Sequence, residues 1–101
     1  MKYILYRSYG NIENEDRKHE LVAVEYGKDI YEATDSLIRA VSDDLSEMSE
    51  YVGCKTTAFA PEMIQSFFKV KKYKYVIVGQ VIPPNAKENI LIEYGIIEES
   101  E

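Results

Sequence analysis

A regular apolar pattern between positions 29 and 52 constrains the fold of this chain more than any other feature. Mostly apolar side chains recur there every three or four residues, which places them on one side of an α-helix. The stripe consists of Ile30, Thr34, Leu37, Ile38, Val41, Leu45, Met48 and Val52. Asp29 with Glu32 resembles a capping box, and Gly53 suits the left-handed residue that ends a helix. The sequence therefore predicts one long amphipathic helix over residues 29–52.

Segments rich in β-branched and aromatic residues flank this helix and predict four strands. They cover residues 3–6, 21–24, 73–82 and 90–97. A second, shorter helix is expected over residues 60–68, because a proline such as Pro61 is tolerated in the first turn of a helix. The order β-β-α-α-β-β predicts an α+β fold, in which a four-stranded antiparallel sheet carries the long helix on one face.

The size and composition of the chain fit one globular domain. With 101 residues, of which 46% are hydrophobic and 30% charged, the chain can bury one core, so we expect a single domain over residues 1–101. No apolar run approaches the roughly 18 residues that cross a membrane, and the first residues lack the layout of a signal peptide. One cysteine, Cys54, fits a reducing compartment. We therefore expect a cytoplasmic protein without a membrane segment.

His19 and Cys54 are the side chains to consider for catalysis or metal binding, and the sequence favours neither role. No second histidine, CxxC pair or spaced carboxylate cluster completes a ligand set around His19. A reactive thiolate at Cys54 needs a base or a positive environment, whereas a lone cysteine after a helix is usually a small packing residue. Glu25 and Glu93 interrupt apolar strands, and we expect both to face solvent. We expect no catalytic residue, metal or cofactor, and an enzyme ranks last among the hypotheses.

Acidic side chains line the polar side of the predicted helix and form the first candidate surface for a partner. The candidates are Asp35, Asp43, Glu47 and Glu50. The chain has a formal net charge of −6, which argues against direct binding of nucleic acid or of an anionic membrane. Solvation alone also explains such a face, because surface charge keeps proteins soluble. As a binding surface, it would suit a protein partner with a basic surface.

Tyrosine is the second unusual feature, since the chain has nine tyrosines and no tryptophan. Tyrosine is favoured in strands for structural reasons alone. If several tyrosines share the sheet face away from the helix, they present the rigid amphipathic area that is typical of protein interfaces. The candidates for this role are Tyr73, Tyr75 and Tyr94.

The segment from Lys69 to Tyr75 mixes basic and aromatic side chains, a combination that binds phosphates and stacks on bases. Strand alternation would place Lys72 and Lys74 on one face and the tyrosines on the other, which weakens this interpretation. An alternating strand does not combine both groups on one surface, so direct nucleic-acid binding ranks low.

Our leading hypothesis is a non-enzymatic binding module that inhibits or regulates a partner protein through its acidic helix, its tyrosines or both. In size and charge the chain is similar to the nucleic-acid-mimicking inhibitors carried by phages and mobile elements, which place carboxylates in sites built for phosphates. The alternative is a domain that sequesters or senses a small nucleotide-like ligand. A homodimer would form if the C-terminal strand lay at a sheet edge and paired with its twin.

Overall fold

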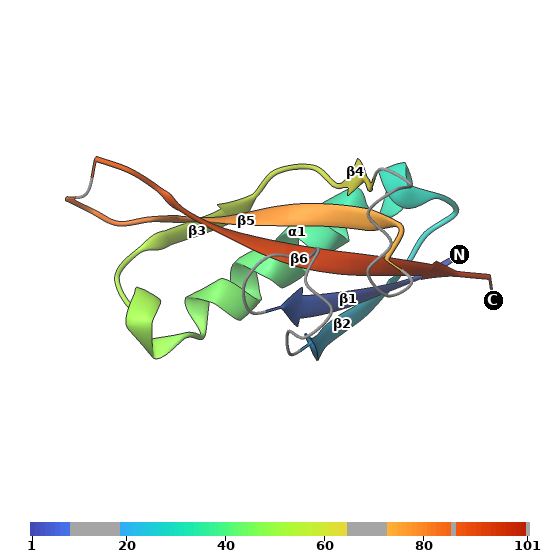
Figure 1. Cartoon of the computed structure of the whole chain (residues 1–101), viewed down its shortest axis with the longest axis horizontal. Coiled ribbons are helices and arrows are strands. Elements are labelled where there is room, and N and C mark those ends of the chain that lie inside the picture. The colour runs from blue at the N-terminus through green and yellow to red at the C-terminus, as the bar shows by residue number, and fades with distance from the viewer. Residues whose placement is uncertain (9–18, 65–72, 86, 101) are drawn as a thin grey trace.

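One antiparallel sheet curls as a half-barrel around one long helix, giving an α+β fold (Figure 1). The structure is a computed structural model that describes residues 1–8, 19–64, 73–85 and 87–100. Within these ranges the helical elements are α1 (Ile30–Ser46) and the 3₁₀ turn η1 (Ser49–Tyr51). The strands are β1 (Lys2–Ser8), β2 (His19–Tyr26), β3 (Lys55–Ala58), β4 (Glu62–Met63), β5 (Tyr75–Ile82) and β6 (Ile90–Glu99).

The strand order in space is β2-β1-β6-β5-β3, and the short β4 also pairs with β5. Every pair is antiparallel. The pairing of β1 with β6 joins an N-terminal to a C-terminal hairpin, and its register runs from Lys2 opposite Glu99 to Arg7 opposite Tyr94. The C-terminal strand, considered above as an edge for dimerisation, therefore lies at the centre of the sheet. Among the described strands the edges of this path are β2 and β3.

The α+β class, the antiparallel sheet and the helix on one face are confirmed, but the prediction of four strands is wrong. The described ranges contain six strands, because β3 and β4 add to the outer side of β5. The second helix is also wrong at its start, since Glu62 and Met63 pair with Val76 and Tyr75 as a strand. A proline such as Pro61 can precede a strand as well as a helix, and here the edge of β5 supplies the backbone partners. The rest of that predicted helix, from residue 65, lies outside the described residues.

The start of the long helix is confirmed, whereas its end comes earlier than predicted. Asp29 caps the helix by accepting a hydrogen bond from the Glu32 backbone N–H at 2.9 Å. α1 ends at Ser46, and Val52 is 79% exposed instead of lying on the buried stripe. Gly53 does adopt the left-handed conformation, with φ of 85°, but it follows the η1 turn and not α1. No helix in the described ranges combines the length and the apolar content that crossing a bilayer requires.

The core lies between α1 and the concave face of the sheet. Its fully buried large side chains are Tyr3, Leu5, Leu37, Val41, Leu45, Ile77, Val81, Tyr94 and Ile96. Gly79 on β5 allows α1 to approach closely, because a Cβ atom there would lie 2.7 Å from Leu45 Cδ1 and 2.8 Å from Val41 Cγ1. A larger residue at this position would push the helix away from the sheet.

Polar contacts fasten one side of α1 to the edge strand β3. Ser42 Oγ donates a hydrogen bond to the Thr56 carbonyl oxygen at 2.8 Å, and Thr56 Oγ1 donates to the Ser42 carbonyl oxygen at 2.9 Å. These reciprocal bonds satisfy polar groups that the packing partly buries. The side of the helix next to β3 is therefore closed.

Candidate functional site: an acidic groove beside an edge strand

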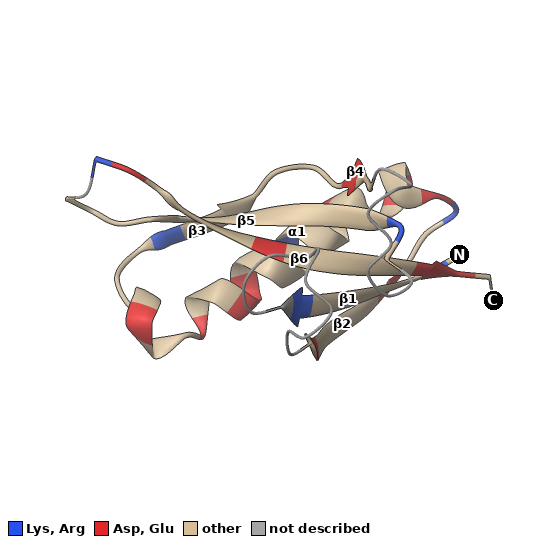
Figure 2. Cartoon of the chain, in the orientation of Figure 1, with Lys and Arg blue, Asp and Glu red and all other residues tan. Residues whose placement is uncertain are grey.

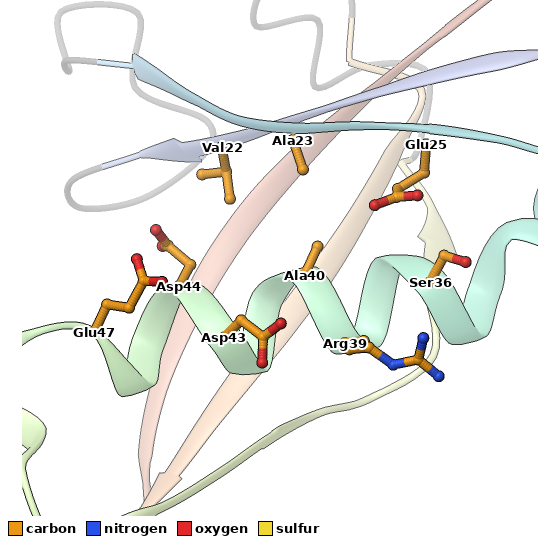
Figure 3. A pocket seen from close by; sticks show the side chains of 9 residues that line it. All are labelled: Val22, Ala23, Glu25, Ser36, Arg39, Ala40, Asp43, Asp44 and Glu47. Atoms are coloured by element: carbon orange, nitrogen blue, oxygen red, sulfur yellow. The ribbon is translucent and has the colours of Figure 1, made fainter.

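On its other side, α1 is separated from the edge strand β2 by an open groove of about 340 Å³ (Figure 3). Small apolar side chains, Val22 and Ala23 from β2 and Ala40 from α1, form part of its lining. The polar lining residues are Glu25, Ser36, Arg39, Asp43, Asp44 and Glu47. The groove is thus a cleft between a strand and a helix, with apolar and charged groups on both.

Negative charge dominates this groove. Its described lining residues include the four carboxylates of Glu25, Asp43, Asp44 and Glu47, against the one guanidinium of Arg39. Figure 3 shows the carboxylates of Asp44 and Glu47 near one end and Glu25 on the strand toward the other end. Acidic residues also recur along the helix ribbon in Figure 2. A groove with this excess of carboxylates attracts cationic groups and repels phosphates.

A buried tyrosine and an arginine hold one of these carboxylates in place. Tyr94 Oη donates a hydrogen bond to Asp44 Oδ2 at 2.6 Å, and Arg7 Nε lies 3.4 Å from the same oxygen. Arg7 Nη2 also donates to Glu20 Oε2 at 3.0 Å. Burial raises the pKa of Tyr94, and the hydrogen bond to Asp44 raises it further. This network ties the last turns of α1 to β1, β2 and β6, so the acidic end of the groove is structurally fixed.

The structure separates the four predicted acidic candidates into two pairs. Asp43 and Glu47 line the groove, and both side chains are exposed. Asp35 on α1 and Glu50 in η1 are exposed as well, but they do not belong to the groove lining. Asp43 and Glu47 are therefore the candidates that the fold brings together.

The condition for a tyrosine interface, that several tyrosines share the face away from the helix, is not met by two of the three candidates. Tyr75 and Tyr94 point toward α1 and are 7% and 0% exposed, so they are core residues. Tyr73 lies on the opposite face, where its ring covers Gly95 and lies 5.9 Å from the ring of Tyr6. Tyr73 is itself only 9% exposed. Strand alternation explains this division, because the register fixes which face each side chain takes.

Two acidic groove residues, Glu25 and Asp44, were not among the predicted candidates, and each had a signal in the sequence. Glu25 was expected in solvent, but it is only partly exposed and lines the groove. Its signal is an acid within an apolar strand. Asp44 lies three residues after Val41 and seven after Leu37, which puts a carboxylate on the apolar stripe of the helix. A charged residue on a buried stripe indicates a specific polar partner, here Tyr94.

His19 and Cys54 do not form a catalytic pair. His19 begins β2, and its Nδ1 lies 2.6 Å from Tyr73 Oη. Cys54 directly precedes β3, at the opposite edge of the sheet, and packs against the core. The nucleophile-and-base arrangement considered from the sequence is therefore absent between these two described residues.

A second polar cluster lies where the ends of β1 and β6 pair. Lys74 Nζ donates a hydrogen bond to Glu98 Oε1 at 2.6 Å, and Tyr75 Oη donates to Glu98 Oε2 at 3.4 Å. The pKa of Glu98 is lowered, mainly by the hydrogen bond from Lys74 and further by the neighbouring Tyr3 and Tyr75. Partial burial of the carboxylate acts in the opposite direction. Burial, assisted by Glu98, raises the pKa of Tyr3. These hydrogen bonds join β6 to Lys74 and to the start of β5 and have a structural role.

Neither the arrangement of possible metal ligands nor comparison with known proteins adds an assignment to the groove. Within the described ranges, no three His, Cys, Asp or Glu side chains are arranged to hold a metal ion. No protein-family model, curated protein or solved structure matches this chain.

Proposed function

We propose that this protein is a binding module without catalytic activity, which docks its acidic groove on a basic surface of a partner protein. The observation that supports this most is the excess of carboxylates over guanidinium groups along the groove between β2 and α1. Complementary charge accelerates the encounter of two proteins, and burial of the apolar lining lengthens the life of the complex. Asp44 is fixed in position before binding by Tyr94 and Arg7, and because Arg7 offsets its charge, the exposed Asp43 and Glu47 present the negative charge to a partner.

The sharpest form of this proposal is an inhibitor, of the kind phages and mobile elements encode, that covers a nucleic-acid-binding surface. A surface built to bind phosphates is basic and therefore attracts carboxylates. The net charge of −6 and the exposed Asp43 and Glu47 support this choice of partner. In this form the protein competes with nucleic acid and chemically alters nothing.

Two double variants with the same change in charge test the docking site. Asp43→Lys with Glu47→Lys reverses the exposed groove acids, and Asp35→Lys with Glu50→Lys reverses two exposed acids outside it. A partner captured by the wild-type protein and identified by mass spectrometry is purified, and its Kd for all three proteins is measured. We expect the groove variant to weaken binding by at least about tenfold, equivalent to about 1.4 kcal/mol, and the control variant by much less.

Other outcomes would count against the groove. Equal weakening by both double variants would show that overall charge, and not this site, drives binding. Carbodiimide cross-linking supplies an independent readout, because it joins a carboxylate to a lysine amine in direct contact. We expect cross-links from Asp43 or Glu47 to partner lysines, and cross-links confined to Asp35 or Glu50 would contradict the proposal.

A small-ligand site ranks second because the groove volume of about 340 Å³ lies within the range of ligand pockets. The same carboxylates disfavour a nucleotide, since its phosphates would meet like charge. Thermal unfolding in the presence of AMP, ADP and ATP separates the two functions. We expect no rise in Tm, and a concentration-dependent rise would favour the small-ligand alternative.

A further inference from the structure

The outer edge of β2 presents backbone groups that no described strand pairs with. Among the described strands β2 pairs with β1 alone. The Gly27 N–H donates to the Met1 carbonyl oxygen at 3.2 Å, and bonded residue pairs alternate along an antiparallel ladder. In the register of β1 with β2, the backbone groups of Glu25 and Ala23 therefore face β1. Those of Val24 and Tyr26 point to the outer edge, where they can bind another strand.

The two faces of β2 differ in the chemistry that they would offer such a strand. On the helix side, Ala23 and Glu25 lie beside the groove, opposite the acids of α1. On the other side, Tyr26 is 60% exposed and Val24 lies beside it. The register of β2 shifts between Ala23 and Leu21, and this bulge at Val22 brings Leu21, which is 61% exposed, to the same face as Tyr26. Because side chains alternate along a strand, an added strand would place one set over carboxylates and the other beside apolar groups.

We propose that β2 accepts an extended segment of the partner protein as a further antiparallel strand, and that this segment alternates basic and apolar side chains. This inference rests on the proposed function and specifies the form of the bound partner. The basic side chains reach over the groove toward Glu25, Asp43 and Glu47, and the apolar ones cover Leu21 and Tyr26. Backbone hydrogen bonds supply affinity in this mode, and alternate side chains supply specificity.

Two comparisons favour this edge and this occupant. β2 has eight residues, whereas β3 at the other described edge has four and is fastened to α1 through Ser42 and Thr56. A second copy of this chain would bring its own Glu25 and groove acids against those of the first, and like charges across a sheet are destabilising. A basic segment from another protein removes that repulsion.

Defined peptides test the proposal without knowledge of the partner. The probe is a capped peptide of about seven residues that alternates lysine with valine, close to the usual length of a strand. A peptide of the same composition, with its lysines and valines in two blocks, controls for charge. Binding to the whole protein is measured by fluorescence anisotropy. We expect the alternating peptide to bind at least about tenfold more tightly than the block peptide.

Backbone methylation of the same peptide tests the hydrogen bonds themselves. In an antiparallel pair, the peptide residue directly opposite Val24 places its side chain on the same apolar face, so this residue is a valine. Because the backbone groups of Val24 point outward, that valine pairs with them, and the valine amides of the peptide point toward β2. N-methylation of the valines should weaken binding at least about tenfold, whereas N-methylation of the lysines should leave it nearly unchanged. In amide hydrogen exchange, the amides of Val24 and Tyr26 should become protected when the peptide binds.

Variants of the protein complete the test. Leu21→Ser should weaken binding of the alternating peptide several-fold. Val52→Ser is the control and should leave binding unchanged, because Val52 is an apolar residue that is 79% exposed at another place on the surface. One outcome separates the two proposals: the alternating, block and methylated peptides bind equally, and Asp43→Lys with Glu47→Lys weakens the binding of all three. In that case strand addition is overturned, and the acidic docking site stands. If no basic peptide binds, or the protein dimerises through β2, strand addition is overturned, and the Kd values of the two double variants for the captured partner decide the docking proposal separately.

Discussion

Tyr94 shows how one buried hydroxyl fixes the position of an acidic side chain at the groove. The residue is fully buried, and its hydroxyl donates to Asp44 Oδ2 at 2.6 Å. Tyr94→Phe keeps the ring and removes the donor, so the carboxylate loses its shortest contact. We expect the free energy of unfolding to fall by about 1.5–3 kcal/mol, the range for hydrogen bonds to charged groups. Urea unfolding measures the change, with Tyr31→Phe as the control because Tyr31 is 84% exposed. Equal effects of the two substitutions would contradict this role for Tyr94.

The acidic residues of the groove differ in how far the sequence alone could predict them. Asp43 and Glu47 could be predicted, because their place on the polar side of the helix follows from local spacing. The role of Asp44 depends on Tyr94 and Arg7, which are far away in the sequence and reach it only through the pairing of β1 with β6. A single sequence does not reveal such long-range partners.

Among the elements, local signals predicted α1 well and predicted the outer strands poorly. The cap at Asp29 and the apolar stripe are encoded within the helix itself, so both were predictable. β3, with the sequence Lys-Thr-Thr-Ala, and the two-residue β4 carry little pattern of their own. They are strands because β5 offers unpaired backbone groups beside them. The faces of the tyrosines could not be predicted for a related reason, since the register between strands decides which side chains meet the helix.

The close contact of α1 with β5 depends on the absence of a side chain at Gly79. Gly79→Ala would place a Cβ atom 2.7 Å from Leu45 Cδ1 and 2.8 Å from Val41 Cγ1, and both residues are fully buried. We expect the variant to lose about 1–3 kcal/mol of stability, although alanine normally suits a strand interior better than glycine. Urea unfolding of the wild type, Gly79→Ala, Leu45→Ala and the double variant gives a double-mutant cycle. The cost of Gly79→Ala should be smaller when Leu45 is already truncated, and strictly additive effects would contradict the packing argument.

For the molecule as a whole, the fold leaves one side of the helix closed and the other open. The half-barrel is fastened to α1 at β3 by Ser42 and Thr56, whereas at β2 the acidic groove remains. Both ends of the chain lie at the same end of the molecule, where β1 and β6 pair (Figure 1). Glu98 links the end of β6 to Lys74 and to Tyr75 at the start of β5, so its charged form contributes to stability where these strands meet.

The lowered pKa of Glu98 predicts how stability changes with acid. Glu98 is charged in both the folded and the unfolded chain at neutral pH, so its stabilising effect is fully present above its ordinary pKa of 4.5. Below 4.5 the unfolded chain takes up the proton first, and the stabilisation is lost as pH falls toward the folded-state pKa. The free energy of unfolding should therefore fall more steeply below pH 4.5 in the wild type than in Glu98→Gln. The difference should be modest, because the Lys74 side chain is 47% exposed and water screens the pair.

Glu99→Gln is the matched control for this measurement, because it removes the same charge from the neighbouring, exposed position on the strand. Urea midpoints at a series of pH values give the three profiles. Both variants reduce the net negative charge equally, so general electrostatic repulsion affects them alike. We expect the urea midpoint of Glu99→Gln to change with pH as in the wild type. The midpoint of Glu98→Gln should fall less steeply as the pH is lowered. If the urea midpoint of Glu98→Gln instead falls with pH in parallel with that of the wild type, the hydrogen bonds of Lys74 and Tyr75 to Glu98 do not stabilise its charged form.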